Sequence, residues 1–404
     1  MKDFSEFFLM NTQDVMRYAV EVLGFFEKDE ELICSEIGDG NINYVFKVQS
    51  QNRDKSVIVK QADRFLRSSG RPLDTYRNKI EAHILMIEGE LAPGFVPIVY
   101  HYDETMAACS MEDVSAFLNL RHELAENRIY PHLADNLSTF MAKTLLPTTD
   151  LVLDRAEKKR RVGFFVNPEL CEISEDLVLT EPYYNFKNRN IISPGNEDFV
   201  NEQLYEDEAL HAEIAYLRER FMNLSQALIH GDLHSGSVFA NEEGIKVLDP
   251  EFAFYGPMGY DIGNVVGNLL FSLVNKNITM PQNTTAIKKL EDTIADVWDL
   301  TFSKLSSMYD ELVSFKLYKT EGFKKQYFDS VMADSLGYAG TEIIRRTVGD
   351  SKVSEVNSVT EGDLRIRLER VLTLIGKELI MRRRESFIGR DIVCIANRII
   401  KETA

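Results

Sequence analysis

The densest group of residues able to do chemistry lies in the segment 229–239, which contains His230-Gly231-Asp232. A second acidic group, Asp249-Pro250-Glu251, follows a short apolar run that ends at Leu248. This order predicts a strand, a tight loop, a second strand, a turn and a third strand, with carboxylates at the strand ends. A lone aspartate in a loop is more often a simple turn former. Two acidic groups in this order favour chemistry instead.

Phosphoryl transfer needs the groups that such a loop provides. One carboxylate orients the acceptor hydroxyl and takes its proton, and other carboxylates hold Mg²⁺, which neutralises the phosphates. The sequence therefore predicts that Asp232 is the base and that Asp249 and Glu251 are metal ligands. A glycine turn at Gly38-Asp39-Gly40-Asn41, lying between two expected strands, adds backbone N–H groups that can cover phosphates.

These motifs resemble those of known kinases of small alcohols. His230-Gly231-Asp232 is similar to the catalytic loop of aminoglycoside and choline phosphotransferases. Asp249-Pro250-Glu251 stands where protein kinases have DFG. The longer stretches HGDLHSGSVFAN and DPEFAFYGPMGYDIGN closely resemble the 5-methylthioribose kinase family. The resemblance implies a bilobal, protein-kinase-like α+β fold that uses ATP and Mg²⁺.

The resemblance also implies a set of nucleotide-binding residues. The phosphate loop of the family is matched by Gly38, Asp39, Gly40, Asn41 and Asn43, with Asn43 in place of the third glycine of a kinase loop. Lys60 closes an expected strand, as the phosphate-binding lysine of kinases does. Glu81 is the expected ion-pair partner of Lys60, with Glu88 as a rival. The adenine-binding hinge is expected at Met111, Glu112, Asp113 and Val114.

Two positions of the catalytic segment leave alternatives open. Ser237 stands where protein kinases have an asparagine that binds metal, so it is a candidate ligand. The second metal contact passes to Glu251 in this interpretation, because a carboxylate oxygen is a hard ligand that suits Mg²⁺. His234 is either a contact of the catalytic loop or a residue that packs within the turn, and packing is favoured.

A pair of adjacent arginines, Arg345 and Arg346, resembles the twin-arginine segment of the same family. The resemblance implies that they contact the sugar or the transferring phosphate. Adjacent helical residues point about 100° apart, so both reach one site only where the side or end of their helix lines it. Two guanidinium groups there would hold sugar hydroxyls and stabilise phosphoryl charge.

The expected reaction transfers the γ-phosphoryl group of ATP to the anomeric 1-hydroxyl of 5-methylthioribose, a step of methionine salvage. One rival is a kinase of the same fold for an aminoglycoside, choline or homoserine. The arginines disfavour a cationic acceptor, whereas the acidic surface weakly favours one. A second rival is a pseudokinase that only binds nucleotide, which the presence of the lysine, the base and the metal acids disfavours.

The elements that must position these groups follow from periodicity. Helical spacing at 12–23, with Thr12 as a cap, precedes strand patterns near 32–34, 44–48 and 56–61. A helix over 77–88 and strands near 96–100 and 106–111 complete a β-rich lobe, residues 1–112. Residues 113–404 read as mainly helical, with long periodicities at 116–145, 198–222, 284–313, 323–347 and 363–384, and a β patch over 228–248.

The composition is that of an ordered globular protein. The 404 residues are 44% hydrophobic, and a chain of this length normally divides into two or more domains. A formal charge of −18 disfavours nucleic acid or anionic membrane as a partner. The four cysteines lack CxxC spacing, and no signal peptide or membrane span is expected, so the protein is expected to be soluble and cytoplasmic. The family resemblance suggests a homodimer.

Overall fold

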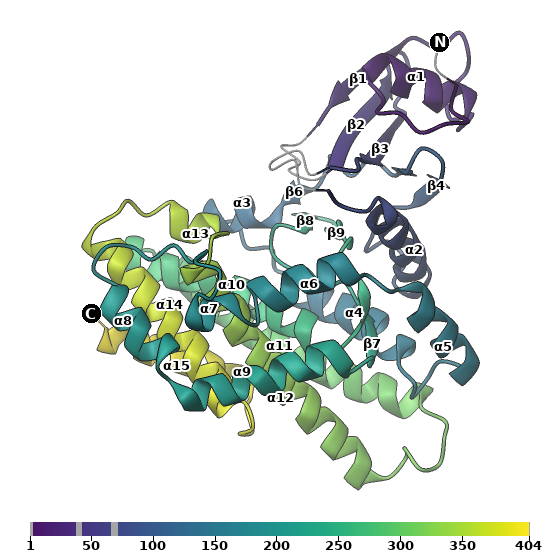
Figure 1. Ribbon diagram of the computed structural model, residues 1–404. Coiled ribbons are helices and arrows are strands. Elements are labelled where there is room, and N and C mark those ends of the chain that lie inside the picture. The colour runs from purple at the N-terminus through teal and green to yellow at the C-terminus, as the bar shows by residue number, and fades with distance from the viewer. Residues whose placement is uncertain (1–2, 38–42, 66–71, 404) are drawn as a thin grey trace. The chain divides into compact units, whose positions relative to one another are not determined.

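The computed structural model describes residues 3–37, 43–65 and 72–403. The chain divides into two compact units. The first holds Met1–Phe117 and Lys246–Ala253, and the second holds Leu118–Ile245 and Phe254–Ala404. The first is rich in strands and the second is mainly helical, which confirms the predicted α+β class (Figure 1).

The compact units differ in two ways from the predicted division at residues 112 and 113. The first unit continues to Phe117, because Ser115 and Asp113 bond to Lys47 and Ser56 of its sheet. It also includes the later segment Lys246–Ala253, in which Val247 N–H donates to Phe95 O at 2.7 Å. Asp249 and Glu251 therefore belong to the first unit, whereas Asp232 belongs to the second.

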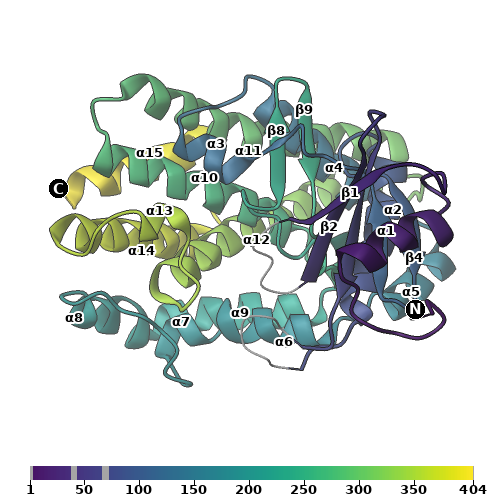
Figure 2. The same cartoon turned by 90° about the horizontal axis from the view of Figure 1, so that it is seen from above.

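The first unit is built on one antiparallel sheet in the order β1-β2-β3-β5-β4. Its elements are α1 (Thr12–Glu21), β1 (Leu32–Glu36), β2 (Asn43–Ser50), β3 (Ser56–Ala62), α2 (Tyr76–Leu91), β4 (Val99–Asp103) and β5 (Ala108–Met111). Helix α1 packs on this sheet through an apolar cluster that includes Val15, Tyr18, Val48, Val57 and Val59 (Figure 2). The alternation of apolar residues along β2 and β3 creates the face that α1 covers.

The N-cap of α1 is Asn11, not Thr12 as the sequence predicted. The Asn11 side chain accepts from the N–H groups of Gln13 and Asp14, and the Asp14 carboxylate in turn accepts from Asn11 N. Asparagine caps helices better than threonine, and this reciprocal pair satisfies both ends of the capping box.

The second unit contains most of the helices of the chain. Its N-terminal half comprises β6 (Leu118–Asn119), α3 (Leu120–Ala125), α4 (Leu133–Leu145), the 3₁₀ turn η1 (Leu146–Thr148), α5 (Arg155–Phe164), α6 (Pro168–Leu177), α7 (Glu181–Tyr184), α8 (Glu197–Val200), the π turn η2 (Asn201–Tyr205), α9 (Glu208–Asn223), β7 (Ala227–Ile229) and β8 (Val238–Asn241). Strand β9 (Gly244–Val247) then leaves this unit and enters the first.

The C-terminal half of this unit is a helical core. It comprises β10 (Phe254–Gly256), α10 (Gly259–Thr279), α11 (Thr284–Leu312), α12 (Glu321–Val348), α13 (Ser354–Asn357), α14 (Asp363–Arg382) and α15 (Gly389–Glu402). Strand β10 pairs with β7, and β6 pairs with β8, so short ladders hold the start and end of the catalytic segment.

The helix predicted over 116–145 is broken in the structure. Helix α3 ends at Ala125 and α4 begins at Leu133. Asn127 lies between them with φ 63°, a left-handed conformation that ends a helix. Pro131 follows and cannot continue one. The apolar periodicity runs across the gap because both helices bury a face in the same core.

Close packing between α10, α12 and α14 fixes the position of α12 (Figure 2). A Cβ on Gly263 of α10 would lie 2.6 Å from Ala339 N of α12, and one on Gly340 of α12 would overlap Gly376 O of α14. Only glycine allows backbones to approach so closely. This contact sets the register in which α12 presents its last turn, which carries Arg345 and Arg346.

None of the helices formed by the described residues combines the length and the apolarity that crossing a membrane requires. The four cysteines are free thiols in the structure.

Candidate active site

Lys60 lies at the centre of an ion-pair chain in the first unit. Its Nζ lies 2.7 Å from Glu81 Oε1 on α2 and 2.6 Å from Asp249 Oδ1. Lys60 and Glu81 are both buried. The sequence offered two glutamates, Glu81 and Glu88, as the ion-pair partner of Lys60. The structure places Glu81 in contact with Lys60. Asp249 has φ 62°, a left-handed conformation that aspartate tolerates better than most residues.

Glu251, the second acid of the pair, is held by side chains of β2 and α2. Asn43 Nδ2 donates to Glu251 Oε2 at 3.1 Å, and Arg77 Nε lies 3.6 Å from the same oxygen. Arg77 Nη2 in turn donates to Asn43 Oδ1 at 2.9 Å. The Asn43 side chain, predicted to bind nucleotide, thus contacts Glu251 and Arg77. Arg77 stands one helical turn before Glu81, so one face of α2 serves both acids.

Burial and the neighbouring opposite charges shift the pKa values of this group in opposite directions. Burial alone would lower the pKa of Lys60, but Asp249 and Glu81 raise it well above its ordinary range. Burial raises the pKa of Glu81 to about 7, against the opposing charge of Lys60. Burial also raises the pKa of Glu251, although Lys60 and Arg77 oppose this shift. Burial disfavours the negative charge of such a carboxylate, and its cationic neighbours offset this only in part, so the carboxylate is suited to binding a further cation.

The predicted hinge directs its side chains into its own unit. Glu112 Oε2 lies 2.9 Å from Lys246 Nζ, and Asp113 Oδ2 lies 2.7 Å from Lys47 Nζ. Met111 and Val114 are buried, and Glu112 N–H donates to Ile98 O. Binding of adenine there would use main-chain groups, since the two acidic side chains already have partners. Gly38, Asp39, Gly40 and Asn41 of the predicted phosphate loop lie outside the described residues.

The catalytic segment of the second unit is anchored from α10. Asp261 accepts from His230 N at 2.7 Å and from Gly231 N at 3.0 Å. Gly231 has φ 80°, a conformation that glycine adopts at no steric cost. His230 Nδ1 accepts from Asp232 N at 3.3 Å. These contacts fix the backbone from which the Asp232 side chain projects.

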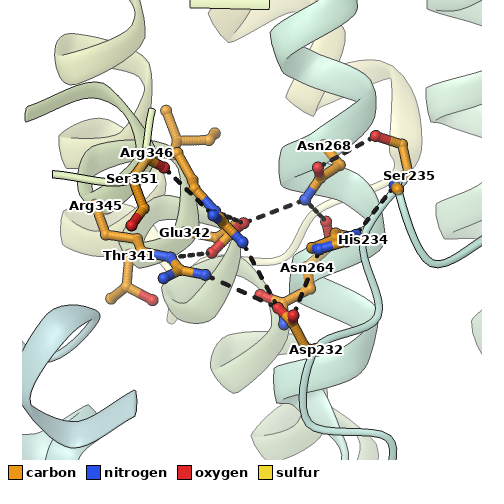
Figure 3. Close-up of polar contacts among 12 residues, drawn as sticks. Asp232, His234, Ser235, Asn264, Asn268, Thr341, Glu342, Arg345, Arg346 and Ser351 are labelled. Atoms are coloured by element: carbon orange, nitrogen blue, oxygen red, sulfur yellow. Dashed lines mark hydrogen bonds and ion pairs between the residues drawn. The ribbon is translucent and has the colours of Figure 1, made fainter. Parts of the chain in front are cut away.

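Both predicted arginines approach Asp232 from the last turn of α12 (Figure 3). The distances to Asp232 Oδ1 are 3.8 Å from Arg345 Nη2 and 3.7 Å from Arg346 Nη2. Glu342 lies one turn earlier, 2.9 Å from Arg345 Nε and 3.1 Å from Arg346 Nε. This buried carboxylate draws two side chains that leave the helix in different directions toward the same point.

Asp232 is fully ionised in this environment. Burial raises its pKa, but His234 and the two arginines outweigh burial and lower the pKa to about 2. The guanidinium nitrogens lie farther from Asp232 than the 2.7–3.2 Å of direct hydrogen bonds. The carboxylate is therefore charged, and its arginine neighbours act on it mainly through charge. This geometry suits a group that accepts a hydrogen bond from an acceptor hydroxyl.

The Ser237 hydroxyl is engaged within the loop itself. It is buried, lies 3.0 Å from Asp232 O and 2.9 Å from His234 O, and accepts from His234 N at 3.0 Å. Metal binding by Ser237 stays a prediction, and these contacts give its hydroxyl a structural role. His234 also bonds within the turn, since its Nδ1 accepts from Gly236 N and Ser237 N.

Sequence reasoning missed several residues that build the site. They are Arg77, Arg121, Asp261, Asn268 and Glu342. Glu342 had a local signal, because a glutamate three and four residues before two arginines lies on their side of a helix. Arg121 and Asn268 had none. Arg121 Nη2 donates to Asn268 Oδ1 at 2.8 Å, and Asn268 Nδ2 lies 3.4 Å from Glu342 Oε1.

The neutral state of His234 predicts a pH-dependent stability. Burial lowers its folded-state pKa to about 4, below the value of about 6.5 in an unfolded chain. As the pH falls from about 6.5 to about 4, only the unfolded state takes up the proton, so the free energy of unfolding decreases. We expect wild type to lose about 1–2 kcal/mol more than His234→Asn between pH 7 and pH 5 in urea titrations. Equal losses would contradict this expectation.

Known proteins match this chain along most of its length. A methylthioribose kinase from Geobacillus sp. (strain WCH70) is 38% identical over 363 residues, which cover 89% of each chain. One from Bacillus cereus (strain AH820) is 36% identical over 376 residues, covering 90% of this chain and 91% of that one. One from Bacillus pumilus (strain SAFR-032) is 34% identical over 385 residues, or 94% of each chain.

A family model described as the phosphotransferase enzyme family matches residues 180–285. That span includes Asp232, Asp249, Glu251 and the anchoring Asp261. The motifs recognised in the sequence and the relatives of the whole chain lead to the same assignment. The chain belongs to the methylthioribose kinase family.

Proposed function

We propose that this protein transfers the γ-phosphoryl group of ATP to the 1-hydroxyl of 5-methylthioribose, giving 5-methylthioribose 1-phosphate and ADP in methionine salvage. The observation that carries the proposal is the ionised Asp232 with two guanidinium groups beside it. It is supported by the methylthioribose kinases that are 34–38% identical to this chain.

The acceptor half of the reaction uses residues of the second unit. Asp232 accepts the hydrogen bond of the 1-hydroxyl and takes its proton as the oxygen attacks the γ-phosphorus. The bond from that phosphorus to the bridging oxygen breaks, and ADP leaves with the electron pair. Arg345 and Arg346 stabilise charge on the transferring group and hold sugar oxygens. A positioned base of this kind contributes about 10²–10⁴ to the rate.

The nucleotide half uses residues of the first unit. Lys60, kept charged by Glu81 and Asp249, would hold the phosphates. The main chain at Met111–Val114 would meet adenine, and the phosphate loop that contains Gly38–Asn41 would cover the phosphates. Asn43 acts here through Glu251, which it holds by a hydrogen bond.

The donors present fit Mg²⁺. No group of three or more His, Cys, Asp or Glu able to hold a metal ion occurs among the described residues. Mg²⁺ is normally bound by one or two carboxylates together with substrate phosphates and water, so the pair Asp249 and Glu251 suffices. When bound, the ion would neutralise phosphate charge.

The charged groups beside Asp232 favour a neutral sugar over a cationic alcohol as the acceptor. Two guanidinium groups, those of Arg345 and Arg346, lie beside the one carboxylate of Asp232. An aminoglycoside or choline would bring its positive charge against the guanidinium groups. A kinase of another neutral acceptor remains the alternative.

The test is ADP release from purified protein with ATP and Mg²⁺, using 5-methylthioribose, kanamycin, choline and homoserine in parallel. We expect turnover with 5-methylthioribose alone, and ³¹P NMR of the product should show a sugar 1-phosphate. Turnover with one of the other alcohols would keep the kinase and overturn the sugar assignment. ATP binding without turnover on any acceptor would favour a binding module.

The metal assignment makes a separate prediction. Asp249→Asn removes one hard anionic ligand while Lys60 keeps its partner Glu81, so the fold should survive. We expect the Mg²⁺ concentration for half-maximal activity to rise at least about tenfold. Asp54→Asn, an exposed aspartate of the same unit, is the matched control. An unchanged Mg²⁺ dependence would remove Asp249 from the metal site.

Two further expectations stay predictions. The resemblance suggests a homodimer, which light scattering of the purified protein would check. A cytoplasmic location is expected for an enzyme of methionine salvage, and fractionation of cells would check it.

A further inference from the structure

Both ring nitrogens of His234 have contacts within the catalytic loop. Nδ1 accepts from Gly236 N and from Ser237 N, each at 3.0 Å. Nε2 lies 3.4 Å from Asp232 Oδ2 (Figure 3). The loop is built closely around the ring, because a Cβ on Gly236 would lie 2.8 Å from His234 Cε1.

The two amides determine which tautomer the ring adopts. A nitrogen that accepts two N–H groups carries no hydrogen, so in a neutral ring the hydrogen is on Nε2. A ring whose Nδ1 accepts both amides is neutral, and its one N–H is on Nε2, the nitrogen that lies 3.4 Å from Asp232 Oδ2.

The turn does not depend on that Nε2 contact. The two amide bonds to Nδ1 and the three contacts of the Ser237 hydroxyl close residues 232–237 without it. The contact from Nε2 to Asp232 is thus a separate feature. It lies on Oδ2, whereas both arginines lie nearest to Oδ1.

We propose that His234 is a positioning residue for the phosphoryl transfer, in which its Nε2–H holds Asp232 Oδ2 and leaves Oδ1 to take the proton of the acceptor hydroxyl. The inference rests on the proposed function, because it assumes that Asp232 is the base. It goes beyond packing, because packing within the turn needs Nδ1 alone. His234 does not touch the substrate in this proposal and acts through Asp232.

Two substitutions separate the two roles. His234→Asn places an amide oxygen near the position of Nδ1 and keeps the turn, but it lacks the donor to Asp232. His234→Gln places an amide N–H near the position of Nε2 and keeps the donor, but it loses the acceptor in the turn. His101→Gln, at an exposed position of β4, is the control.

We expect His234→Asn to melt within about 2 °C of wild type, with kcat about 10- to 100-fold lower and the KM for ATP unchanged. His234→Gln should melt lower but retain more of kcat than His234→Asn at a temperature where both are folded. A purely structural role predicts the reverse order, with His234→Asn nearly fully active. That order would overturn the proposal.

A second measurement does not depend on turnover. With ¹⁵N-histidine labelling, the His234 signals, identified by their loss in His234→Asn, should report a protonated Nε2 and an unprotonated Nδ1 from pH 6 to pH 8. They should shift in Asp232→Asn. A protonated Nδ1 or a charged ring would overturn the inference. Inactivity of the wild type on 5-methylthioribose would overturn the substrate assignment alone, because the tautomer is measured without substrate.

Discussion

Asp232→Asn is expected to lower kcat by about 10²–10⁴ while leaving ATP binding within about twofold of wild type. Asparagine has almost the same shape as aspartate, so the loop anchored by Asp261 and His230 should persist. What is lost is the negative charge and the ability to take the hydroxyl proton. The measurement is kcat from ADP release, together with calorimetric binding of ATP and Mg²⁺.

The loss should exceed that of a neutral surface change. Asp329→Asn, which removes an exposed acid paired with Lys325 on the same unit, is the matched control and should retain full activity. The fold of Asp232→Asn should be checked by melting, since Arg345 and Arg346 lose an opposing charge. Turnover near the wild-type rate would remove Asp232 from the role of base.

The largest loss of stability is expected for Glu342→Ala. This buried carboxylate lies within 3.1 Å of Arg345 Nε and Arg346 Nε, and it is kept ionised because the two arginines outweigh the burial that would raise its pKa. Removing it leaves two largely buried guanidinium groups with weaker compensation. Breaking a buried ion pair by removing one partner costs about 3–5 kcal/mol. Urea unfolding monitored by circular dichroism measures this change.

Two companions make the Glu342 result specific. Glu342→Gln keeps an oxygen that accepts from one arginine, so its loss of stability should be smaller. Glu321→Gln, at the exposed first turn of α12, should change the free energy of unfolding by less than about 0.5 kcal/mol. If Glu342→Ala were as stable as Glu321→Gln, the carboxylate would not be what holds the arginines.

The Glu342 variants also report on the acceptor site. If the arginines hold the sugar, losing their shared anchor should raise the KM for 5-methylthioribose more than the KM for ATP. A change confined to the KM for ATP would place the arginines elsewhere in the reaction.

The residues proposed to carry the chemistry were recognisable because each lies in a short, contiguous motif. Asp232 sits in a three-residue loop signature, Asp249 and Glu251 flank one proline, and Lys60 ends an apolar strand. The expected pairing of Lys60 with Glu81 also follows from a local rule, since a helix after that strand presents few acids to it. The structure places Glu81 in contact with Lys60.

The residues that hold these groups were not recognisable in the same way. Arg77 reaches Glu251 from a position more than 170 residues earlier in the chain, and Asn268 links α10 to both α3 and α12. Nothing in a single sequence marks such residues, because a buried polar side chain looks like any other until its partner is known. The helix break between α3 and α4 was missed because the apolar period continues across it.

The sequence by itself determined the type of chemistry, the α+β class and the family, because motif spacing and hydrophobic periodicity are local properties of the chain. The tertiary structure alone decided how the two arginines and Asp232 meet. Glycines of α10, α12 and α14 let three helix backbones approach closely, and this packing brings the last turn of α12 to Asp232. Which charges become neighbours depends on that approach, and close packing between distant segments is a property of the folded chain rather than of any one stretch of it.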